Sequence, residues 1–423
     1  MTKSQLEAGM KDQFRTLKLA CYTTNISMSV VSNLPPVLFL TFRQLYGISY
    51  SLLGLLVVFN FVTQLTVDLI FSFFSHKFNI QKTVRATPLF CAAGLILFAV
   101  WPHLFPGNVY LGLVIGTMIF SAGSGLAEVL ISPVIAAIPS DDPDRQMSGL
   151  HSVYAWGVVF VIIFSTLFLL AFGAENWPIL TVILSLIPIT SGILFSRSKI
   201  PAMQTPEKVS DTVKFLKDKG LWLCVFAIFL GGASECTMAQ WCSSYLEQAM
   251  GIPKVWGDIF GVAMFSVLLG IGRSAYAKRG KNIGKVLLWC AIGATACYFL
   301  AALSPIPLIG LLACAFTGLC TSMLWPGNLV VAADRFPTGG VFLYAMMAAG
   351  GDLGASVAPQ LVGVITDIAI ESATLTAIAQ NLGFAPEQLG MKLGMLVGML
   401  FPLVAIFTCN HIRKSRKEKG LEH

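Results

Sequence analysis

Two glutamates, Glu128 and Glu235, lie in the middle of apolar stretches that are long enough to cross a lipid bilayer. Glu128 lies within the run 111–138, and Glu235 lies within the run 221–246. An ionisable side chain in hydrocarbon costs several kcal/mol, so such a residue usually faces the polar interior of a helix bundle and serves the passage of an ion or a solute. The two positions therefore predict a protein that moves something across a membrane.

Glu128 shares one helical face with small polar residues. Ser121, Gly125, Glu128 and Ser132 follow spacings of four, three and four, which places them on the same side of a helix. A desolvated acid on such a face is suited to taking up and releasing a proton near neutral pH. We predict proton coupling at Glu128, with Glu235 as a second proton-coupling residue. Permanent pairing of Glu128 with a cation or a hydroxyl is the alternative.

Aromatic and polar residues around Glu235 form a second group. On an ideal helix Glu235 and Trp241 point about 120° apart, so both line one cavity only if the helix is broken near its paired glycines or is open on that side. Trp241 and Tyr245 share a face and are suited to stacking on a sugar ring, although bundle packing explains them equally well. The predicted solute-binding residues are Asn33, Glu128, Tyr154, Glu235, Gln240, Trp241, Tyr245, Trp325, Asn328 and Asp352.

A third group lies nearer the predicted inner side of the membrane. Asp68 and Arg273 lie about 9 Å from the inner ends of their helices, at 1.5 Å per residue, in matching places of the two halves. We predict gating or interdomain roles for them; a snorkelling Arg and a locally paired Asp are the alternative. His151, three residues before Tyr154, is assigned to the same gating group, although a membrane His is more often simply hydrogen-bonded.

The composition predicts a membrane protein. Of the 423 residues, 56% are hydrophobic and 12% are charged, and the mean hydropathy is +0.76, which is far more apolar than soluble domains. A spanning helix needs about 20 predominantly apolar residues. Twelve such runs are separated by short polar breaks, at 19–42, 50–74, 85–101, 110–138, 147–172, 177–196, 220–246, 255–277, 284–303, 307–333, 338–367 and 391–412.

The chain divides near its middle. The longest inner break, 197–219, is charged and is either an amphipathic surface helix or a solvated tether. Similar pentapeptides, Gln44–Ile48 and Gln248–Ile252, end the first helix of each half, as expected of a transporter built from repeats. We predict an all-α polytopic membrane protein with twelve transmembrane helices in two pseudo-symmetric six-helix bundles, at 1–196 and 220–423, joined by the linker 197–219. Residues 421–423 resemble a purification-tag scar and are set aside.

The positions of the basic residues predict the topology. With a cytoplasmic N-terminus, 24 of the 28 Lys and Arg residues lie on the inner side, so both termini are predicted to be cytoplasmic. The net charge of +7 thus reflects topology and does not indicate a nucleic-acid partner. The ten cysteines lie in apolar runs without a C-x-x-C pair and are read as small buried hydrophobes. Because no nucleotide-binding, hydrolase or metal motif is present, we predict no enzyme activity, no cofactor and no metal.

Twelve helices, a charged middle loop and cytoplasmic termini resemble the major facilitator superfamily over essentially the whole chain. The signature of that family between helices 2 and 3 is degraded here, since Phe73–Asn79 has His76 where the family has an Asp. Gly123–Glu128 followed by Pro133 is similar to helix 4 of the fucose permease group of proton-coupled sugar symporters. In that group the Glu takes part in proton and sugar handling, and the resemblance implies this role for Glu128.

One departure from the fucose permease group concerns helix 1. The group has an Asp after Asn-Leu-Asn, whereas here Asn33-Leu34 is followed by Pro35-Pro36. The resemblance then implies that Glu128 works alone or that Glu235 substitutes for the missing acid.

Taken as a whole, these features predict a secondary active transporter that works by alternating access and imports a monosaccharide or a similar small polar solute together with protons. A drug or metabolite exporter and an organic-anion carrier of the same fold are the alternatives, followed by a non-transporting membrane sensor. We expect a monomer in the plasma membrane, specifically a bacterial inner membrane, in contact with lipid.

Overall fold

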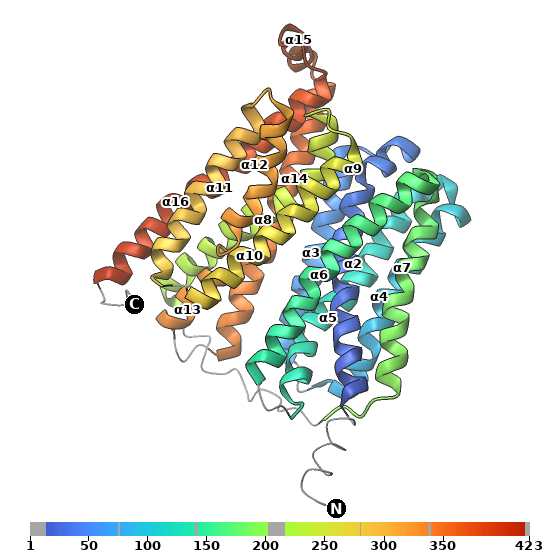
Figure 1. Ribbon diagram of the computed structural model, residues 1–423, viewed down its shortest axis with the longest axis vertical. Coiled ribbons are helices and arrows are strands. Elements are labelled where there is room, and N and C mark those ends of the chain that lie inside the picture. The colour runs from blue at the N-terminus through green and yellow to red at the C-terminus, as the bar shows by residue number, and fades with distance from the viewer. Residues whose placement is uncertain are drawn as a thin grey trace, which may run out of the picture. The chain divides into compact units, whose positions relative to one another are not determined.

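The computed structural model describes residues 14–74, 77–139, 143–201, 216–279, 281–336 and 340–418, and these residues are almost entirely helical (Figure 1). Twelve helical segments are long and apolar enough to cross a membrane, which confirms the fold class and the number of spans. The long helices are α2 Arg15–Tyr46, α3 Tyr50–Phe74, α4 Ile80–Leu104, α5 Val109–Ala136, α6 Pro143–Phe172, α7 Trp177–Ser196, α8 Lys219–Gln248, α10 Met264–Arg279, α11 Ile283–Leu303, α12 Pro307–Thr321, α14 Gly340–Glu371 and α16 Pro386–Glu418.

The structure interrupts some spans that the sequence predicts as continuous. The tenth span is broken between α12 and α13, because Pro326 has no N–H to donate and instead starts the new helix. By contrast α8 runs unbroken through Gly231 and Gly232, so no break near those glycines turns Glu235 and Trp241 toward one cavity. The remaining short elements are η2 Pro106–Asn108, η3 Ala174–Asn176, α9 Lys254–Trp256, the π turn η5 Gly257–Ala263, α13 Pro326–Arg335 and α15 Ala373–Asn381.

The chain forms two compact units. The first contains residues 1–35 and 66–208, and the second contains 36–65 and 209–423. One division falls within the predicted linker 197–219, but the other two fall inside α2 and α3, so each of these helices belongs partly to both units. The domain boundaries at 196 and 220 stay predictions. His76, residues 202–215 of the linker, where most of the predicted surface helix falls, and residues 421–423 lie outside the described residues.

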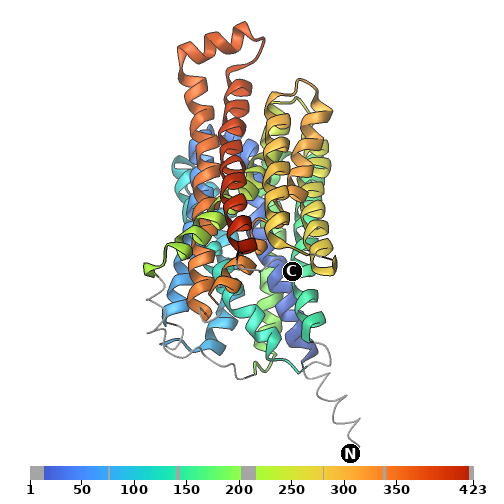
Figure 2. The same ribbon diagram turned by 90° about the vertical axis from the view of Figure 1, so that its left-hand side faces the viewer.

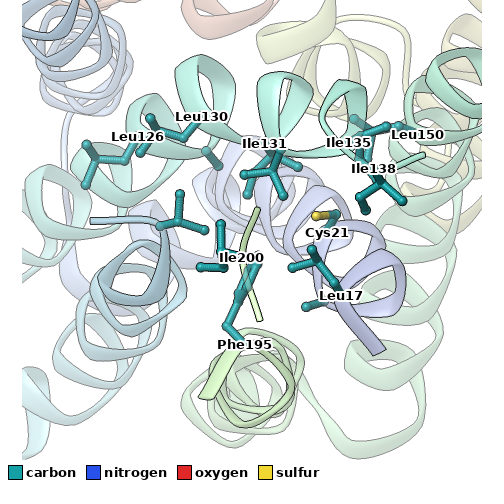
Figure 3. Close-up of a cluster of buried hydrophobic side chains, with 14 of the residues drawn as sticks. Leu17, Cys21, Leu126, Leu130, Ile131, Ile135, Ile138, Leu150, Phe195 and Ile200 are labelled. Carbon is teal, nitrogen blue, oxygen red and sulfur yellow. The ribbon is translucent and has the colours of Figure 1, made fainter. Parts of the chain in front are cut away.

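An apolar core fills one end of the first unit. Buried residues of α5 recur at helical spacing and meet side chains from α2, α6, α7 and the chain that follows α7 (Figure 3). Glu128, on the same helix, does not belong to this core. The core residues labelled in Figure 3 are Leu17, Cys21, Leu126, Leu130, Ile131, Ile135, Ile138, Leu150, Phe195 and Ile200.

Closely packed helices build the second unit. Helix α14 packs against α8 and α16, and α11 packs against α12 and α16; Figure 2 shows α14 and α16 side by side, joined through α15 at one end. Glycines allow backbone contact, since a Cβ added at Gly354 would lie 2.1 Å from the carbonyl oxygen of Phe229. Small residues of this kind let membrane helices approach closely, and they fix the helices that position the site below.

The two pentapeptides that suggested a repeat end in the same backbone conformation. Gly47, after α2, and Gly251, after α8, both have φ of +65°, a left-handed conformation that glycine adopts without strain. No atom lies within 4 Å of the Cβ position of either residue, so the requirement for glycine is conformational rather than steric. The sequence match therefore reflects matching helix ends at equivalent places in the two halves.

Candidate functional site

Glu235 and Arg273 form an ion pair within the second unit. Nη2 of Arg273, on α10, donates to both carboxylate oxygens of Glu235, on α8, at 3.0 and 3.1 Å. Nε of Arg273 donates to the carbonyl oxygen of Ser322 at 3.1 Å, in the break between α12 and α13. The side chains of Arg273 and Glu235 are 42% and 15% exposed, so water reaches the pair from the Arg side. One guanidinium thus links three helical segments.

The indole of Trp325 lies over two glycines close to this ion pair. A Cβ on Gly232, three residues before Glu235, would lie 3.0 Å from the indole, and a Cβ on Gly351 would lie 2.4 Å from it. At Gly351 only glycine leaves room for the ring, and at Gly232 a Cβ would first meet the carbonyl oxygen of Gly351, at 2.3 Å. Trp325 itself is half-buried. The result is a partly exposed aromatic surface between α8 and α14, of the kind that stacks on the apolar face of a sugar.

Asn328 holds the helix break against α8. Its side-chain nitrogen donates to the carbonyl oxygens of Leu324 at 2.6 Å and of Ala227 at 3.2 Å, and the residue is 1% exposed. The amide nitrogen is therefore already committed to backbone acceptors. This geometry supports a role in shaping the break, and the predicted contact of Asn328 with a solute gains no support from it.

Asp352 follows Gly351 on α14 and is 7% exposed. The preceding residue, Gly351, lies against the indole of Trp325, so Asp352 lies in the part of α14 that faces the helix break. Four predicted residues thus gather around the helix break. They are Glu235, Trp325, Asn328 and Asp352.

In the first unit, Glu128 is exposed although it lies well inside the apolar span of α5. Asp68, on α3, is 6% exposed, and its Oδ1 is buried without a hydrogen-bond partner. The negative charge of Glu128 acts on Asp68. Within the described ranges neither carboxylate forms an ion pair with a basic side chain. The sequence assigns Asp68 to a gate, and the structure sets it within electrostatic range of Glu128.

Two further predicted residues of the first unit, Asn33 and Tyr154, are half-buried. Asn33 donates to the carbonyl oxygen of Ser29 at 2.9 Å, and the Ser29 hydroxyl donates to the carbonyl oxygen of Tyr154 at 2.8 Å. The first bond lies within α2, and the second joins α2 to α6. His151 belongs to α6, but its side chain lies outside the described part of the chain. The binding and gating roles of these residues stay predictions.

Trp241 and Tyr245 lie in the interior of the second unit. Both side chains are 0% exposed. The indole nitrogen of Trp241 donates to the carbonyl oxygen of Pro359 at 2.8 Å, and the hydroxyl of Tyr245 donates to that of Ala301. Gln240 is 8% exposed. The geometry supports a packing role for the two aromatic residues and gives no support to contact with a solute.

Sequence reasoning missed the pairing of Glu235 with Arg273 and the participation of the Ser322 carbonyl. The signal for the carbonyl was Pro326, because a proline frees a backbone acceptor in the preceding turn. Among the residues that the structure describes, no three acidic, histidine or cysteine side chains lie close enough together to hold a metal ion. The cysteines are free thiols.

Comparison with known structures shows the fold. A D-xylose-proton symporter is 14% identical, with coverage of 94% of this chain and 97% of that chain and a TM-score of 0.71. A nucleoside transporter is 12% identical, with coverage of 94% and 99% and a TM-score of 0.71. The fucose:proton symporter of E. coli is 16% identical, with coverage of 93% and 99% and a TM-score of 0.56. These proteins carry different solutes, so the shared fold does not determine a substrate class.

Among curated proteins no match is found. The model of the Major Facilitator Superfamily matches residues 20–359, which cover most of the twelve spans. The family and fold are those of membrane transporters, and they agree with the resemblance stated from the sequence. The chain therefore belongs to the Major Facilitator Superfamily.

Proposed function

We propose that this protein is a proton-coupled secondary transporter that imports a monosaccharide or a similar small polar solute by alternating access. The observation that carries the proposal is the contrast between its two central glutamates. Glu235 is paired with Arg273, whereas Glu128 has no basic partner among the described residues and lies near a second acid, Asp68.

This contrast favours Glu128 as the proton carrier. A carboxylate inside a membrane span needs a counter-charge or a proton, and Arg273 supplies the counter-charge at Glu235. Two neighbouring carboxylates without a cation disfavour having both charged, so one proton shared by Asp68 and Glu128, which leaves a single negative charge on the pair, is the simplest arrangement. Solute binding with Glu128 protonated, followed by loss of the proton on the cytoplasmic side, would couple the two movements.

The solute is assigned to the site around the helix break. Arg273 and Glu235 offer charged hydrogen-bonding groups to hydroxyls, and the half-buried Trp325 offers an apolar face. A flat aromatic ring beside polar groups matches the two kinds of surface on a sugar. The positive-inside pattern supports cytoplasmic termini and insertion in a bacterial inner membrane, and the solved relatives support a single chain as the working unit.

Reconstitution in proteoliposomes tests the proposal. With an inward proton gradient, the wild-type protein should accumulate a labelled monosaccharide, identified first by thermal shift against a sugar panel. Glu128→Gln should abolish accumulation while retaining solute counterflow, because counterflow needs no net proton movement. Asp68→Asn should weaken the coupling. Glu175→Gln, at an exposed acid in η3, is the matched control. Full accumulation by Glu128→Gln would remove the proton role.

An organic-anion carrier is the second candidate. The observation that favours it is the 42% exposure of Arg273, which leaves part of the guanidinium accessible to an anion. Competition experiments distinguish the sugar symporter from the organic-anion carrier. For the anion carrier, small carboxylates and not hexoses should displace the labelled solute. Arg273→Gln should then abolish binding, and Glu128→Gln should leave it intact.

A further inference from the structure

A carboxylate from a distant part of the chain caps the N-terminus of α3. Asp367, on α14, accepts hydrogen bonds from the backbone N–H groups of Tyr50 at 3.0 Å and Ser51 at 2.7 Å, and also from the hydroxyl of Ser51. The first N–H groups of a helix have no partner inside the helix and form the positive end of its dipole. Asp367 satisfies both needs at once, from a helix more than 300 residues away in sequence.

An ion pair adjoins this cap. Glu387, in the first turn of α16, accepts from Nε of Arg43 at 2.9 Å and from the hydroxyl of Tyr50. The guanidinium of Arg43 also lies 4.1 Å from the centre of the Tyr50 ring. Tyr50 therefore takes part in both groups of contacts. We call Arg43, Tyr50, Ser51, Asp367 and Glu387 the clamp.

Close packing accompanies the clamp. A Cβ at Gly363, on α14, would lie 2.3 Å from the carbonyl oxygen of Tyr50, so the two backbones touch there. The ring of Trp241 lies 5.3 Å from Phe39 and 5.9 Å from Tyr50. The end of α2 and the start of α3 are thus packed on α8 and α14 as well as hydrogen-bonded to α14 and α16. This explains why residues 36–65 group with the second unit.

Helices α2 and α3 continue beyond the second unit, since residues 15–35 and 66–74 belong to the first. We propose that the clamp is the outer gate of the transporter and that Asp367 is its positioning residue. The proposal rests on the proposed function, because a gate requires a carrier. All clamp contacts lie at helix ends on the predicted outer side. Arg43 and Glu387 are 27% and 30% exposed, so water is available to replace their contacts when the gate opens.

Kinetics separate a gate from a permanent helix cap. Asp367→Asn removes the charge that holds the α3 terminus, so the outward-open state should gain population. The KM for external solute should then fall about tenfold, as expected for a coupling of about 1.4 kcal/mol, while the maximal rate falls. Asp367→Glu should restore part of the wild-type behaviour. Glu371→Gln, an exposed acid one turn along α14, should change neither constant. Unchanged KM and maximal rate in Asp367→Asn would overturn the gate.

Hydrogen exchange gives a readout that needs no solute. In a gate, Asp367→Asn should speed exchange together across the segments 37–58 and 360–367, because they separate as a group. In a permanent cap, only the amides of Tyr50 and Ser51 should exchange faster, and the proposal fails while proton-coupled transport stands. Conversely, grouped exchange without uptake of any solute by the wild type would contradict the proposed function and leave the opening of the clamp established.

A reversible cross-link completes the test. The Ser51 hydroxyl touches the Asp367 carboxylate, so the double variant Ser51→Cys with Asp367→Cys should form a disulfide on oxidation. Oxidation should block uptake and dithiothreitol should restore it, whereas each single cysteine variant should be insensitive to oxidation. Uptake that persists in the oxidised double variant, with the disulfide shown by mass spectrometry, would overturn the gate.

Discussion

Arg273 holds Glu235 through one guanidinium nitrogen, Nη2, which donates to both carboxylate oxygens, while Nε is engaged by the carbonyl oxygen of Ser322. This arrangement uses the planar guanidinium to connect α8 and α10 with the break after α12. A lysine in the same place has the charge without the fork of donors. The ion pair therefore also holds these three helical segments together.

The first prediction concerns this ion pair. Because Arg273 is 42% exposed, water screens the attraction, and we expect a coupling energy of about 1 kcal/mol between the two residues. A double-mutant cycle with Glu235→Gln and Arg273→Gln, read by thermal unfolding in detergent, measures it. Arg273→Lys should lower the melting temperature through loss of the Ser322 bond. Strictly additive effects of the two Gln substitutions would show that the pair is not coupled.

A second prediction concerns the glycine beneath Trp325. Gly351→Ala should destabilise the protein by about 1–3 kcal/mol, because the added methyl overlaps the indole and forces a shift in a packed region. It should also weaken solute binding, since the ring moves. Gly270→Ala is the matched control: this α10 glycine has no atom within 4 Å of its Cβ position, so alanine there should be neutral or stabilising. Equal melting temperatures for the two variants would contradict the packing described.

Trp241 gives a third prediction that distinguishes packing from binding. Trp241→Phe loses the hydrogen bond to Pro359 and leaves a small cavity, so we expect a loss of stability of about 2 kcal/mol. If the residue only packs, uptake by the folded fraction should keep the wild-type KM. A large rise in KM without any change in melting temperature would instead restore the solute contact that the sequence suggested.

A fourth prediction concerns a buried lysine, Lys392, which is 8% exposed. Its ammonium group donates to the carbonyl oxygens of Ala302 at 3.2 Å and Ser304 at 3.5 Å, at the end of α11. Lys392→Met keeps the apolar stem and should destabilise the protein by about 1–2 kcal/mol. Lys392→Glu sets a carboxylate against carbonyl oxygens and should be worse by about 3 kcal/mol. Comparable melting temperatures for the two variants would argue against this cap.

The number of spans and their positions were predictable, because each span depends on local composition. The contacts between spans were not. Glu235 and Arg273 are 38 residues apart on different helices, and a backbone depth calculated at about 1.5 Å per residue takes no account of the length of an Arg side chain. From the sequence, Arg273 was therefore predicted to be a gating residue away from the centre of the membrane. In the structure it forms an ion pair with Glu235.

The candidate site was predictable in part, where unusual residue types occur within a span. Trp325 and Asp352 stood out as unusual residue types beside glycines, and the structure brings them close to Glu235. Trp241 stood out equally, yet it is buried. The sequence could not reveal this, because an aromatic residue in a span gives the same pattern whether it faces a cavity or a neighbouring helix. Asp367 and Glu387 attracted no attention, since an acid at a helix end is ordinary until its partner is known.

The division of α2 between the two units falls between Pro35 and Pro36. Neither proline has an N–H to donate, so the helix lacks two successive rungs of its backbone ladder at the place where the units part. Bending is easiest where those rungs are missing. Of the two helices that both units share, α2 is thus the one that lacks backbone hydrogen bonds at the division, and we expect replacement of both prolines with alanine to stiffen it there.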